Sequence, residues 1–412
     1  MISDNPFVSK IFVKTWLKYF KKPSDTYLFE FIKPILFVKS KYSLYFFNVG
    51  RNLTNGIFYS IDNTFKDFKG KVFVLFDVLP YLGYENNRLN LPNRIKIKKV
   101  KQYKGYLTRI SQFNDFEDFF LNHFSGKSRN NIRKWNKRLT NNFEIEFKVF
   151  YGVISKDEYH KIFNAMLALI QKRWGSLGMD NDIYRDRDYY RELCYEMILD
   201  KTASLNVIYA FGEPIAVSIC FVSKKDLFFA ITTFDIDFRK YNMGHLLIMY
   251  IMQWCFDNRI EVFDYSKGTY EYKTRWSNET YFFENHIIYD KTSLKSLIIG
   301  NYLTFFYSFK QFLREKEFNL LYSRFKYHFK NLGWKDNDNI VPSFKIKDVN
   351  DIDLTLFEKI EMDSIDFNDI RGVLYDILFS KPQYLNTVEV YKDEIGKRYL
   401  LVGEKFKKEI IL

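Results

Sequence analysis

The chain has 412 residues, enough for about two or three domains of ordinary size. Hydrophobic residues make up 47% and charged residues 27% of it, which is typical of a soluble globular protein, and no apolar run reaches the roughly 18 to 20 residues that cross a bilayer. A net charge of +13 favours an anionic ligand, a nucleic acid or an acidic membrane surface as partner. The N-terminal region contains Asp4 and lacks an uninterrupted apolar core, so it does not resemble a secretory signal and a cytoplasmic location is expected.

The first quarter of the chain combines helical and strand-like patterns. Residues 7–20 carry apolar side chains at helical spacing. Strand-like runs follow, separated by turn signals, at residues 33–40, 42–50, 56–62, 71–80 and 94–110. A helix is then expected over residues 111–124, with Ser111 or Asn114 as its N-terminal cap. These patterns predict an α/β or α+β unit.

Residues 126–142 predict a surface helix that docks by one edge. Ile132, Trp135 and Leu139 are three and then four residues apart and form one narrow apolar stripe. The other faces of this helix are basic: Lys127, Arg129, Arg133, Lys134, Lys137 and Arg138. Such a surface is either simply solvated or a binding face for an anionic substrate. Two further helices are expected, over residues 155–178 and 186–202.

From Leu205 the hydrophobic period changes to that of strands. The predicted strands cover residues 205–211, 214–222, 227–235, 261–266 and 281–290. The first three are joined by connections short enough for hairpin turns, which predicts an antiparallel meander. An apolar helix separates the third strand from the fourth. The histidines of the chain have no metal-ligand spacing, so no metal site is expected.

The apolar helix starts on unusually bare backbone, Asn242-Met243-Gly244-His245. A helix leaves the N–H groups of its first turn without a helical partner. Gly244 has no Cβ to keep a ligand away, and Asn242 is one of the few non-glycine residues that tolerate a left-handed backbone. Free N–H groups and the helix dipole together favour an anion, usually a pyrophosphate. Arg239 and Lys240, just before the helix, would add charge-assisted hydrogen bonds.

The segment from Arg239 to Gly244 resembles the acyl-CoA pyrophosphate loop of the GNAT acetyltransferase superfamily, Q/R-x-x-G-x-G/A, with Asn242 in place of the first glycine. His245 follows where many relatives have a small residue. The resemblance implies acetyl-CoA or another acyl-CoA as cosubstrate, and no metal. It implies cosubstrate-binding roles for Thr233, Arg239, Lys240, Tyr241, Asn242, Met243, Gly244 and His245.

A second motif points to one branch of that superfamily. Residues 262–278, VFDYSKGTYEYKTRWSN, resemble the fDfgxGxxxYKxxw segment of CelD-like and FemAB-like proteins. The matching positions are Asp264, Gly268, Tyr272, Lys273 and Trp276. Residues 124–139, FSGKSRNNIRKWNKRL, look like the basic helix that opens the transferase domain in that branch. The resemblance covers residues 124–290 and reaches residues 7–119 only as the expected first half of a tandem pair.

The resemblance implies an α/β (α+β) fold of tandem GNAT-like domains, with a mixed, mostly antiparallel sheet flanked by helices and a small C-terminal α/β extension. We expect an N-terminal GNAT-like half at residues 1–123 and an acyltransferase domain with trailing basic helices at residues 124–335. A shift to acidic composition places the start of the extension at residue 336, so that it covers residues 336–412.

In GNAT enzymes the acceptor amine attacks the thioester directly, so the resemblance implies no covalent enzyme intermediate. The protein must then remove a proton from the amine, hold the oxyanion at a backbone N–H near Thr233 and protonate the departing sulfur. The candidate catalytic residues are Asp264, Tyr272, Lys273, Asp235 and Tyr270. The candidate substrate-binding residues are Arg129, Arg133, Trp174, Lys267, Gly268 and Trp276.

The leading hypothesis is an acyl-CoA-dependent N-acyltransferase that acts on an amine of a cell-envelope or polysaccharide-type precursor, either a small molecule or a glycan- or lipid-linked one. One alternative is FemAB-like transfer of an amino acid from aminoacyl-tRNA. Another is a non-catalytic GNAT-like module whose basic surface binds nucleic acid or acidic lipid. The aromatic and basic residues 305–330 predict peripheral contact with the inner face of a membrane, unless they pack on the transferase domain.

Overall fold

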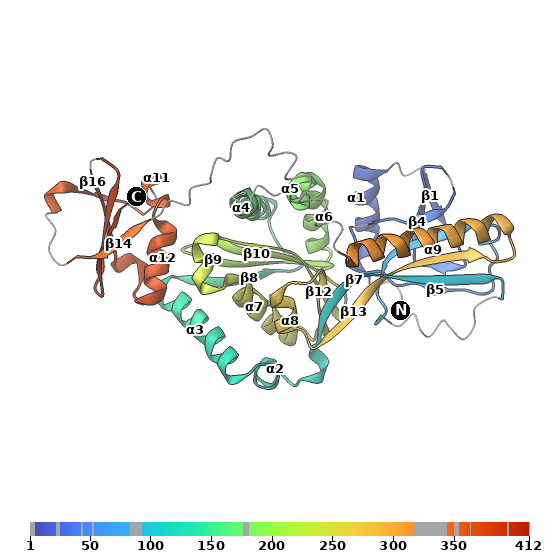
Figure 1. The fold of residues 1–412 in the computed structure, drawn as a ribbon, viewed down its shortest axis with the longest axis horizontal. Coiled ribbons are helices and arrows are strands. Elements are labelled where there is room, and N and C mark those ends of the chain that lie inside the picture. Colours follow the sequence, from blue (N-terminus) through green and yellow to red (C-terminus); the bar gives the residue numbers. More distant parts are fainter. Residues whose placement is uncertain are drawn as a thin grey trace.

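We describe the chain from a computed structural model. The described residues are 5–21, 25–42, 44–51, 53–82, 93–175, 181–316, 344–349, 354–362, 364–393 and 395–411. Along the longest axis of the molecule the N-terminal half lies at one end, the strands of the C-terminal extension lie at the other, and a central sheet with its helices lies between them (Figure 1). The extension boundary predicted at residue 336 lies outside the described residues.

One sheet of 11 strands runs through the N-terminal and central parts in the order β1-β3-β4-β6-β13-β7-β12-β11-β10-β9-β8. Its strands are β1 (Thr26–Leu28), β3 (Leu36–Lys39), β4 (Phe46–Asn48), β6 (Val72–Val78), β7 (Ile95–Arg109), β8 (Ile145–Phe150), β9 (Ala203–Ala210), β10 (Glu213–Val222), β11 (Asp226–Phe234), β12 (Val262–Lys267) and β13 (Glu279–Asp290). A separate pair joins β2 (Ile32–Lys33) and β5 (Ser60–Ile61). All pairs in the large sheet are antiparallel except β4 with β6 and β11 with β12. The predicted mixed, mostly antiparallel sheet and its β9–β11 meander are therefore confirmed.

Strands β7 and β13 join the two halves of the sheet. The C-terminal end of β7 pairs with β12, where Arg109 lies opposite Val262. Along its length β7 also pairs with β13, whose Ile288 lies between Ile97 of β7 and Phe73 of β6. Because β13 follows the central strands in sequence but pairs with the N-terminal ones, the sheet crosses the domain boundary predicted at residues 123/124.

Helices cover both faces of the central strands. Side chains of β9 and β10 alternate between two apolar clusters: Leu205 and Val207 join one, Ile208 and Ala210 the other. The first cluster includes α1 (Lys10–Phe20), α4 (Lys156–Gly175) and α6 (Arg187–Leu199), and the second includes α2 (Phe116–His123), α3 (Gly126–Asn142) and α7 (Met243–Asp257). The short α5 (Asp182–Arg185) follows α4. Asp115 caps α2 by accepting from the N–H of Asp118, so the predicted caps are wrong.

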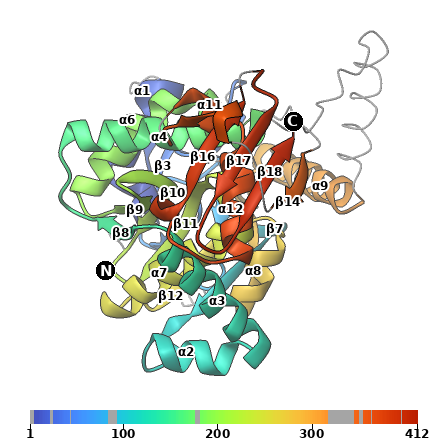
Figure 2. The ribbon, with the colours of Figure 1, turned by 90° about the vertical axis from the view of Figure 1, so that its left-hand side faces the viewer.

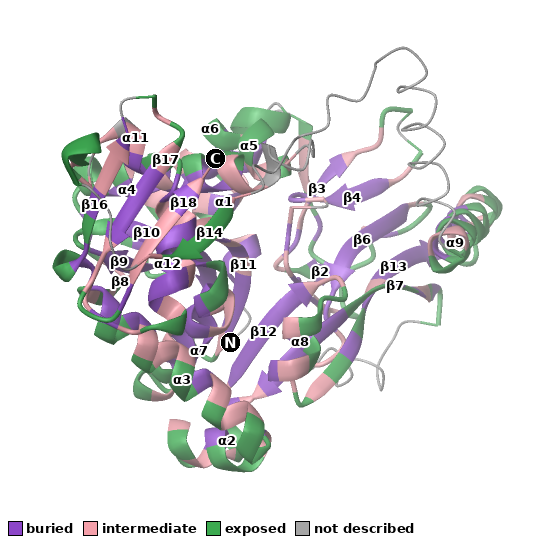
Figure 3. Ribbon diagram, turned by 60° about the vertical axis from the view of Figure 1, so that its left-hand side comes forward, coloured by how far each residue is buried: buried purple, intermediate pink, exposed green. Residues whose placement is uncertain are grey.

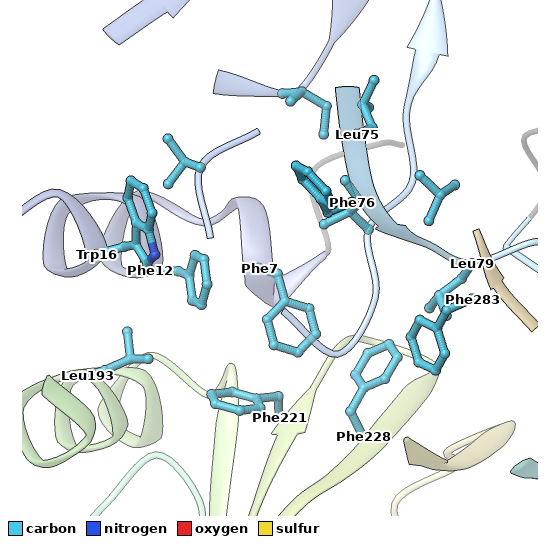
Figure 4. Close-up of a cluster of buried hydrophobic side chains, with 14 of the residues drawn as sticks. Phe7, Phe12, Trp16, Leu75, Phe76, Leu79, Leu193, Phe221, Phe228 and Phe283 are labelled. Atoms are coloured by element: carbon cyan, nitrogen blue, oxygen red, sulfur yellow. The ribbon is translucent and has the colours of Figure 1, made fainter. Parts of the chain in front are cut away.

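The first cluster also joins the N-terminal half to the central sheet. Figure 4 shows Phe7 pointing toward Phe221 of β10 and Phe228 of β11. The ring centroids are 5.0 Å apart for Phe7 and Phe221 and 5.4 Å apart for Phe7 and Phe228, in edge-on geometry. All three residues are buried. The two halves therefore share one continuous core.

Two elements complete the fold. Helix α9 (Leu294–Glu315) packs on β13, β7 and β6. The C-terminal extension is a five-stranded sheet in the order β14-β18-β17-β16-β15, with α11 and α12 beside it (Figure 2). Its elements are β14 (Lys345–Asp348), β15 (Phe357–Ile360), α11 (Ile365–Asn368), α12 (Arg371–Ser380), β16 (Glu389–Asp393), β17 (Arg398–Val402) and β18 (Lys407–Ile411). None of the helices in the described ranges has the length and apolar character that a membrane crossing requires.

Candidate functional site

The candidate site lies where two parallel strands separate. Strands β11 and β12 pair at Asp226–Val262, Leu227–Phe263 and Phe228–Asp264, and the pairing ends there. A cavity with a volume of about 560 Å³ lies beyond this point, lined from β11 by Phe229 to Thr232 and from β12 by Ser266 and Lys267. The predicted site residues that line it are Arg239, Asn242, Gly244, His245, Lys267, Tyr270, Tyr272 and Lys273.

The start of α7 forms one wall of this cavity. Asn242 has φ 52° and ψ 50°, which is the left-handed conformation that the sequence predicts. Among the described residues no backbone carbonyl accepts from the N–H of Met243 or Gly244, whereas the N–H of His245 returns to the carbonyl of Asn242 at 2.8 Å. A Cβ at Gly244 would meet Phe234 at 3.5 Å and would stand at the cavity wall. This bare helix start can therefore receive an anion.

The loop before α7 is held by the C-terminal extension. The loop forms a short 3-10 helix, Ile236–Tyr241, against which α12 packs. Arg239 donates to Asp376 Oδ2 at 2.6 Å, and Lys240 lies 3.5 Å from the same atom. Tyr241 is buried and donates to the carbonyl of Tyr375 at 3.2 Å. The two predicted loop cations are thus already paired with an acid of the extension.

Asp235 lies at a different place from the other catalytic candidates. Lys172 and Arg371 both bridge Asp235 and Asp237, with N···O distances of 2.6 to 2.9 Å. Asp235 lines a second cavity, of about 700 Å³, between α4, the loop before α7 and the extension. The structure does not bring Asp235 together with Lys273.

Lys273 is the ionisable group best placed in the first cavity. It belongs to α8 (Glu271–Trp276) and is 96% buried, with 4% of its surface exposed. Its Nζ donates to the carbonyl oxygens of Ser266 and Lys267. Burial lowers the pKa of Lys273 to about 8, and the nearby charge of Asp264 opposes that shift. A lysine with this pKa is partly neutral near physiological pH and can accept a proton.

Asp264 is enclosed by the protein and lies close enough to Lys273 for their charges to interact. It accepts from the hydroxyls of Tyr81 and Tyr281, each at 2.5 Å, and from the N–H of Ser266 at 2.6 Å. Burial raises its pKa to about 6, although these three hydrogen bonds favour the charged form. Asp264 is fully buried and does not line the cavity, so it can act on substrate only through Lys273.

Two tyrosines and an arginine also line the cavity. The rings of Tyr270 and Tyr272 are stacked, with centroids 6.0 Å apart. Burial raises the pKa of Tyr272, so its hydroxyl keeps its proton at neutral pH. Arg173 lies over the ring of Phe234 at 4.4 Å and also lines the cavity. Tyr272 is therefore a candidate proton donor, and Arg173 supplies a positive charge close to it.

His245 is held in one tautomer. The indole N–H of Trp276 donates to its Nδ1 at 2.8 Å, so the proton of the neutral ring is on Nε2. Burial lowers the pKa of His245 to about 4, which keeps the ring neutral. Trp276 itself is fully buried, and it orients His245 rather than facing the cavity.

Two hydroxyls in the cavity wall have no hydrogen-bond partner among the described residues. These are Thr232 Oγ1 and Ser266 Oγ, both buried. The backbone of Ser266 is left-handed, with φ 61°. Unpaired buried hydroxyls are costly and often mark the place of a ligand. Thr233, the residue predicted near the oxyanion, is fully buried opposite Val217 of β10, and its neighbour Thr232 lines the cavity instead.

Lys267 lines the cavity, whereas the predicted substrate-binding residues Arg129, Arg133 and Gly268 do not. Arg129 donates to the carbonyls of Leu121 and Phe124 in the preceding turn, and Arg133 pairs with Glu117 at 3.2 Å. Lys267 reaches into the N-terminal half, where it contacts Asp77 at 2.7 Å. Gly268 has φ 93° and forms the turn before Tyr270. Met243 is buried at the start of α7, and the side chain of Trp174 lies outside the described part of the chain.

Sequence patterns missed Arg173, Thr232 and Ser266. Alternation along β11 could have separated Thr232 from Thr233, because neighbouring residues of a strand face opposite sides. Arg173 and Ser266 have no sequence signal, since their place depends on how α4 and β12 meet. In the described ranges no group of three or more His, Cys, Asp and Glu side chains could hold a metal ion.

Residues 126–274 match the family described as Acetyltransferase (GNAT) domain. The matched residues form a GNAT domain. They run from α3 to α8 and so include the start of α7, the diverging strands and Lys273. No curated protein shows a significant match to the chain. The predicted GNAT resemblance is confirmed for this segment, and the segment belongs to an acyltransferase family.

Several solved structures are similar to this chain at low identity. FemX is 12% identical, with 65% of this chain and 86% of that chain covered and a TM-score of 0.45. A Bacteroides thetaiotaomicron protein of unknown function is 12% identical, with 69% and 91% covered and a TM-score of 0.43. A tandem GNAT protein from the clavulanic acid biosynthesis pathway is 8% identical, with 53% and 62% covered and a TM-score of 0.28. These similarities carry no argument about substrate.

Proposed function

We propose that this chain transfers an acyl group from acyl-CoA, with acetyl-CoA as the simplest donor, to an amine. One observation carries the proposal: the bare start of α7 and the buried Lys273 line the same cavity. At this start Asn242 has a left-handed backbone and Gly244 has no Cβ. The N–H groups of Met243 and Gly244 would hold the donor pyrophosphate. Arg173 would add a positive charge in the cavity, because Arg239 and Lys240 are already paired with Asp376.

In the proposed reaction Lys273 removes the proton from the acceptor amine. The amine nitrogen then bonds to the acyl carbon as the bond between that carbon and the CoA sulfur breaks. The hydroxyl of Thr232 is placed to donate to the oxyanion, since it lines the cavity without another partner among the described residues. Tyr272 gives its proton to the departing sulfur and regains one from the nitrogen of the new amide, so that its hydroxyl is restored. The charge of Asp264 favours the charged form of Lys273 after proton transfer.

The proposed acceptor is an amine of a cell-envelope or polysaccharide-type precursor, as the CelD-like and FemAB-like resemblance suggests. The acceptor would enter the cavity next to Tyr270, which is 57% exposed. A small molecule or a glycan- or lipid-linked amine would meet this requirement equally well.

Calorimetry with acetyl-CoA and CoA tests the donor. Gly244→Glu places a carboxylate where the pyrophosphate would bind, so it should weaken binding by at least about 100-fold. Gly126→Glu is the matched control, because it adds the same side chain at the start of α3, where a Cβ would meet no atom closer than 3.9 Å. If the wild type does not bind CoA, or if both variants bind it equally, the proposal fails.

A second candidate function has its own observation. A groove of about 360 Å³ on α3 is lined by Arg133, Lys134, Lys137 and Arg138, and by Pro382 of the extension. Four cations along one groove suit a phosphate backbone, which favours FemAB-like use of aminoacyl-tRNA. Binding of tRNA that weakens steeply with salt, together with no binding of CoA, would support this candidate. The same salt dependence without any acyl transfer would support a non-catalytic binding module.

A further inference from the structure

Helix α9 exposes most of its large apolar side chains, and three of its five buried residues are Ser296, Gly300 and Gln311. Its buried positions are Ser296, Gly300, Leu303, Tyr307 and Gln311. Its outer stripe consists of Leu294, Ile298, Tyr302, Phe305, Phe309 and Phe312, which are 49% to 72% exposed. The spacing of three or four residues places these six on one side of the helix. Most surface helices have the opposite arrangement, so this stripe requires a separate explanation.

Both the packing and the position of α9 keep this stripe facing outward. A Cβ at Gly300 would lie 2.4 Å from the ring of Tyr289, so the helix approaches β13 closely at that point. Gln311 donates to the carbonyl of Gln102 on β7 at 3.0 Å. These contacts fix the rotation of the helix about its axis. Figure 3 shows α9 at the rim of the molecule, and Figure 2 shows it at the edge as well.

The outer stripe is a continuous surface of rings. Phe305 and Phe309 are stacked, with their centroids 6.0 Å apart and their planes 8° apart. Tyr302 stacks in the same way on Phe306, which is 45% exposed, at 6.3 Å. A helix of this length spans about 33 Å. Exposed apolar surface of this extent marks an interaction site.

The charges beside the stripe are positive. Lys295, Lys310 and Arg314 lie on α9, and no described acidic side chain is within salt-bridge distance of them. Strand β7, on which α9 packs, adds Lys101 and Lys104, which lie over the rings of Phe282 and Tyr106. The only acid of the helix is Glu315, which accepts from Gln311. A second copy of the chain would bring like charges together, whereas an anionic lipid surface would complement them.

We propose that α9 binds the surface of an anionic lipid bilayer, with its outer stripe in the interfacial region and its cations against the lipid phosphates. The helix lies in the plane of the membrane, since aromatic side chains on one face and cations beside them are typical of interfacial helices. This binding does not involve the donor cavity, so it can be tested independently of the proposed transferase activity.

Vesicle sedimentation with the full chain tests the proposal. The wild type should bind vesicles of phosphatidylcholine with phosphatidylglycerol, and bind pure phosphatidylcholine at least tenfold more weakly. Phe305→Asp with Phe309→Asp should reduce binding to the mixed vesicles by at least tenfold. The matched control is Val153→Asp with Ile395→Asp, which changes two apolar residues that are 80% and 77% exposed on other elements. The control should bind as the wild type does, and circular dichroism confirms that both variants fold.

Three results would overturn the proposal. The wild type could fail to bind the mixed vesicles while remaining monomeric, which would show that the stripe does not contact lipid. The two double variants could bind equally, which would show that the stripe is not the contact. Light scattering could show a wild-type dimer that Phe305→Asp with Phe309→Asp dissociates, which would assign the stripe to a second copy.

Discussion

Helices α7 and α9 are both rich in large apolar residues, and they use them in opposite ways. Eight of the 15 residues of α7 are buried, between the sheet and α2 and α3. In α9 five of 22 residues are buried, and two of those five are Ser296 and Gln311. The feature of α7 that we propose to bind a ligand is its bare N-terminus, whereas the proposed binding surface of α9 is its side.

The difference follows from what each helix packs against. Apolar side chains of β9, β10 and β11 pack against one side of α7, and those of α3 pack against the other. The helix can therefore be apolar on nearly all of its surface. Helix α9 contacts the sheet at Gly300 and through the amide of Gln311. Its close approach leaves no room for a larger side chain at Gly300, whereas Leu303 and Tyr307 are the large side chains that it buries farther along the helix. An apolar composition alone does not separate the two cases.

The largest expected effect is the difference in stability lost when a large side chain is truncated in α7 and in α9. Ile251→Ala removes a side chain that is fully buried in α7 and should lower the free energy of unfolding by about 2–5 kcal/mol. Phe305→Ala removes a larger side chain that is 69% exposed on α9 and should change it by less than about 0.5 kcal/mol. Urea unfolding measures both. A large loss at Phe305 in the absence of lipid would mean that the stripe is covered within the chain.

The sequence predicts those parts of the fold that depend on local pattern. The β9–β11 meander follows from short turns between alternating runs, and the left-handed Asn242 follows from its place between a polar loop and a helix. The path of β13 does not follow from any local pattern. Its Ile288 pairs with Phe73 and Ile97, which lie more than 150 residues earlier in the chain. Such pairing depends on the register of the whole sheet.

The candidate site likewise combines residues that sequence motifs predict with contacts that no local pattern predicts. The cavity brings together Lys273, Tyr272 and Gly244, which the sequence motifs single out. The partner of Arg239 is Asp376, 137 residues later in a segment whose acidic composition gives no hint of this contact. The separation of Asp235 from Lys273 likewise depends on Arg371. Roles of individual residues at the site stay predictions until variants are measured.

The second comparison concerns one glycine in each helix. Gly300→Ala places a Cβ 2.4 Å from the buried ring of Tyr289, and overpacking of about 1–3 kcal/mol outweighs the better helix propensity of alanine. Gly244→Ala places a Cβ at an ordinary 3.5 Å from Phe234, so stability should be unchanged or slightly higher. Urea unfolding separates the two variants. Equal stabilities would show that α9 can move away from β13.

The smallest expected effect is on the pH dependence of stability, which we compare between Lys273 in the cavity wall and a lysine of α9. Burial lowers the pKa of Lys273 to about 8, below the ordinary value of 10.5, because the charged form loses hydration in the cavity wall. Between these two values the unfolded chain binds more protons than the folded one, so stability rises as the pH increases from 7 toward 10. This contribution is lost as the pH falls through 8.

Lys273→Met should therefore flatten that rise by about 1–2 kcal/mol relative to the wild type, and should be the more stable of the two near pH 7. Lys295→Met removes an exposed lysine from α9 and should leave the slope unchanged. Thermal or urea unfolding at several pH values between 7 and 9.5 measures the difference. Identical slopes for all three proteins would mean that Lys273 is charged throughout this range, and a charged lysine cannot serve as the base in the proposed transfer.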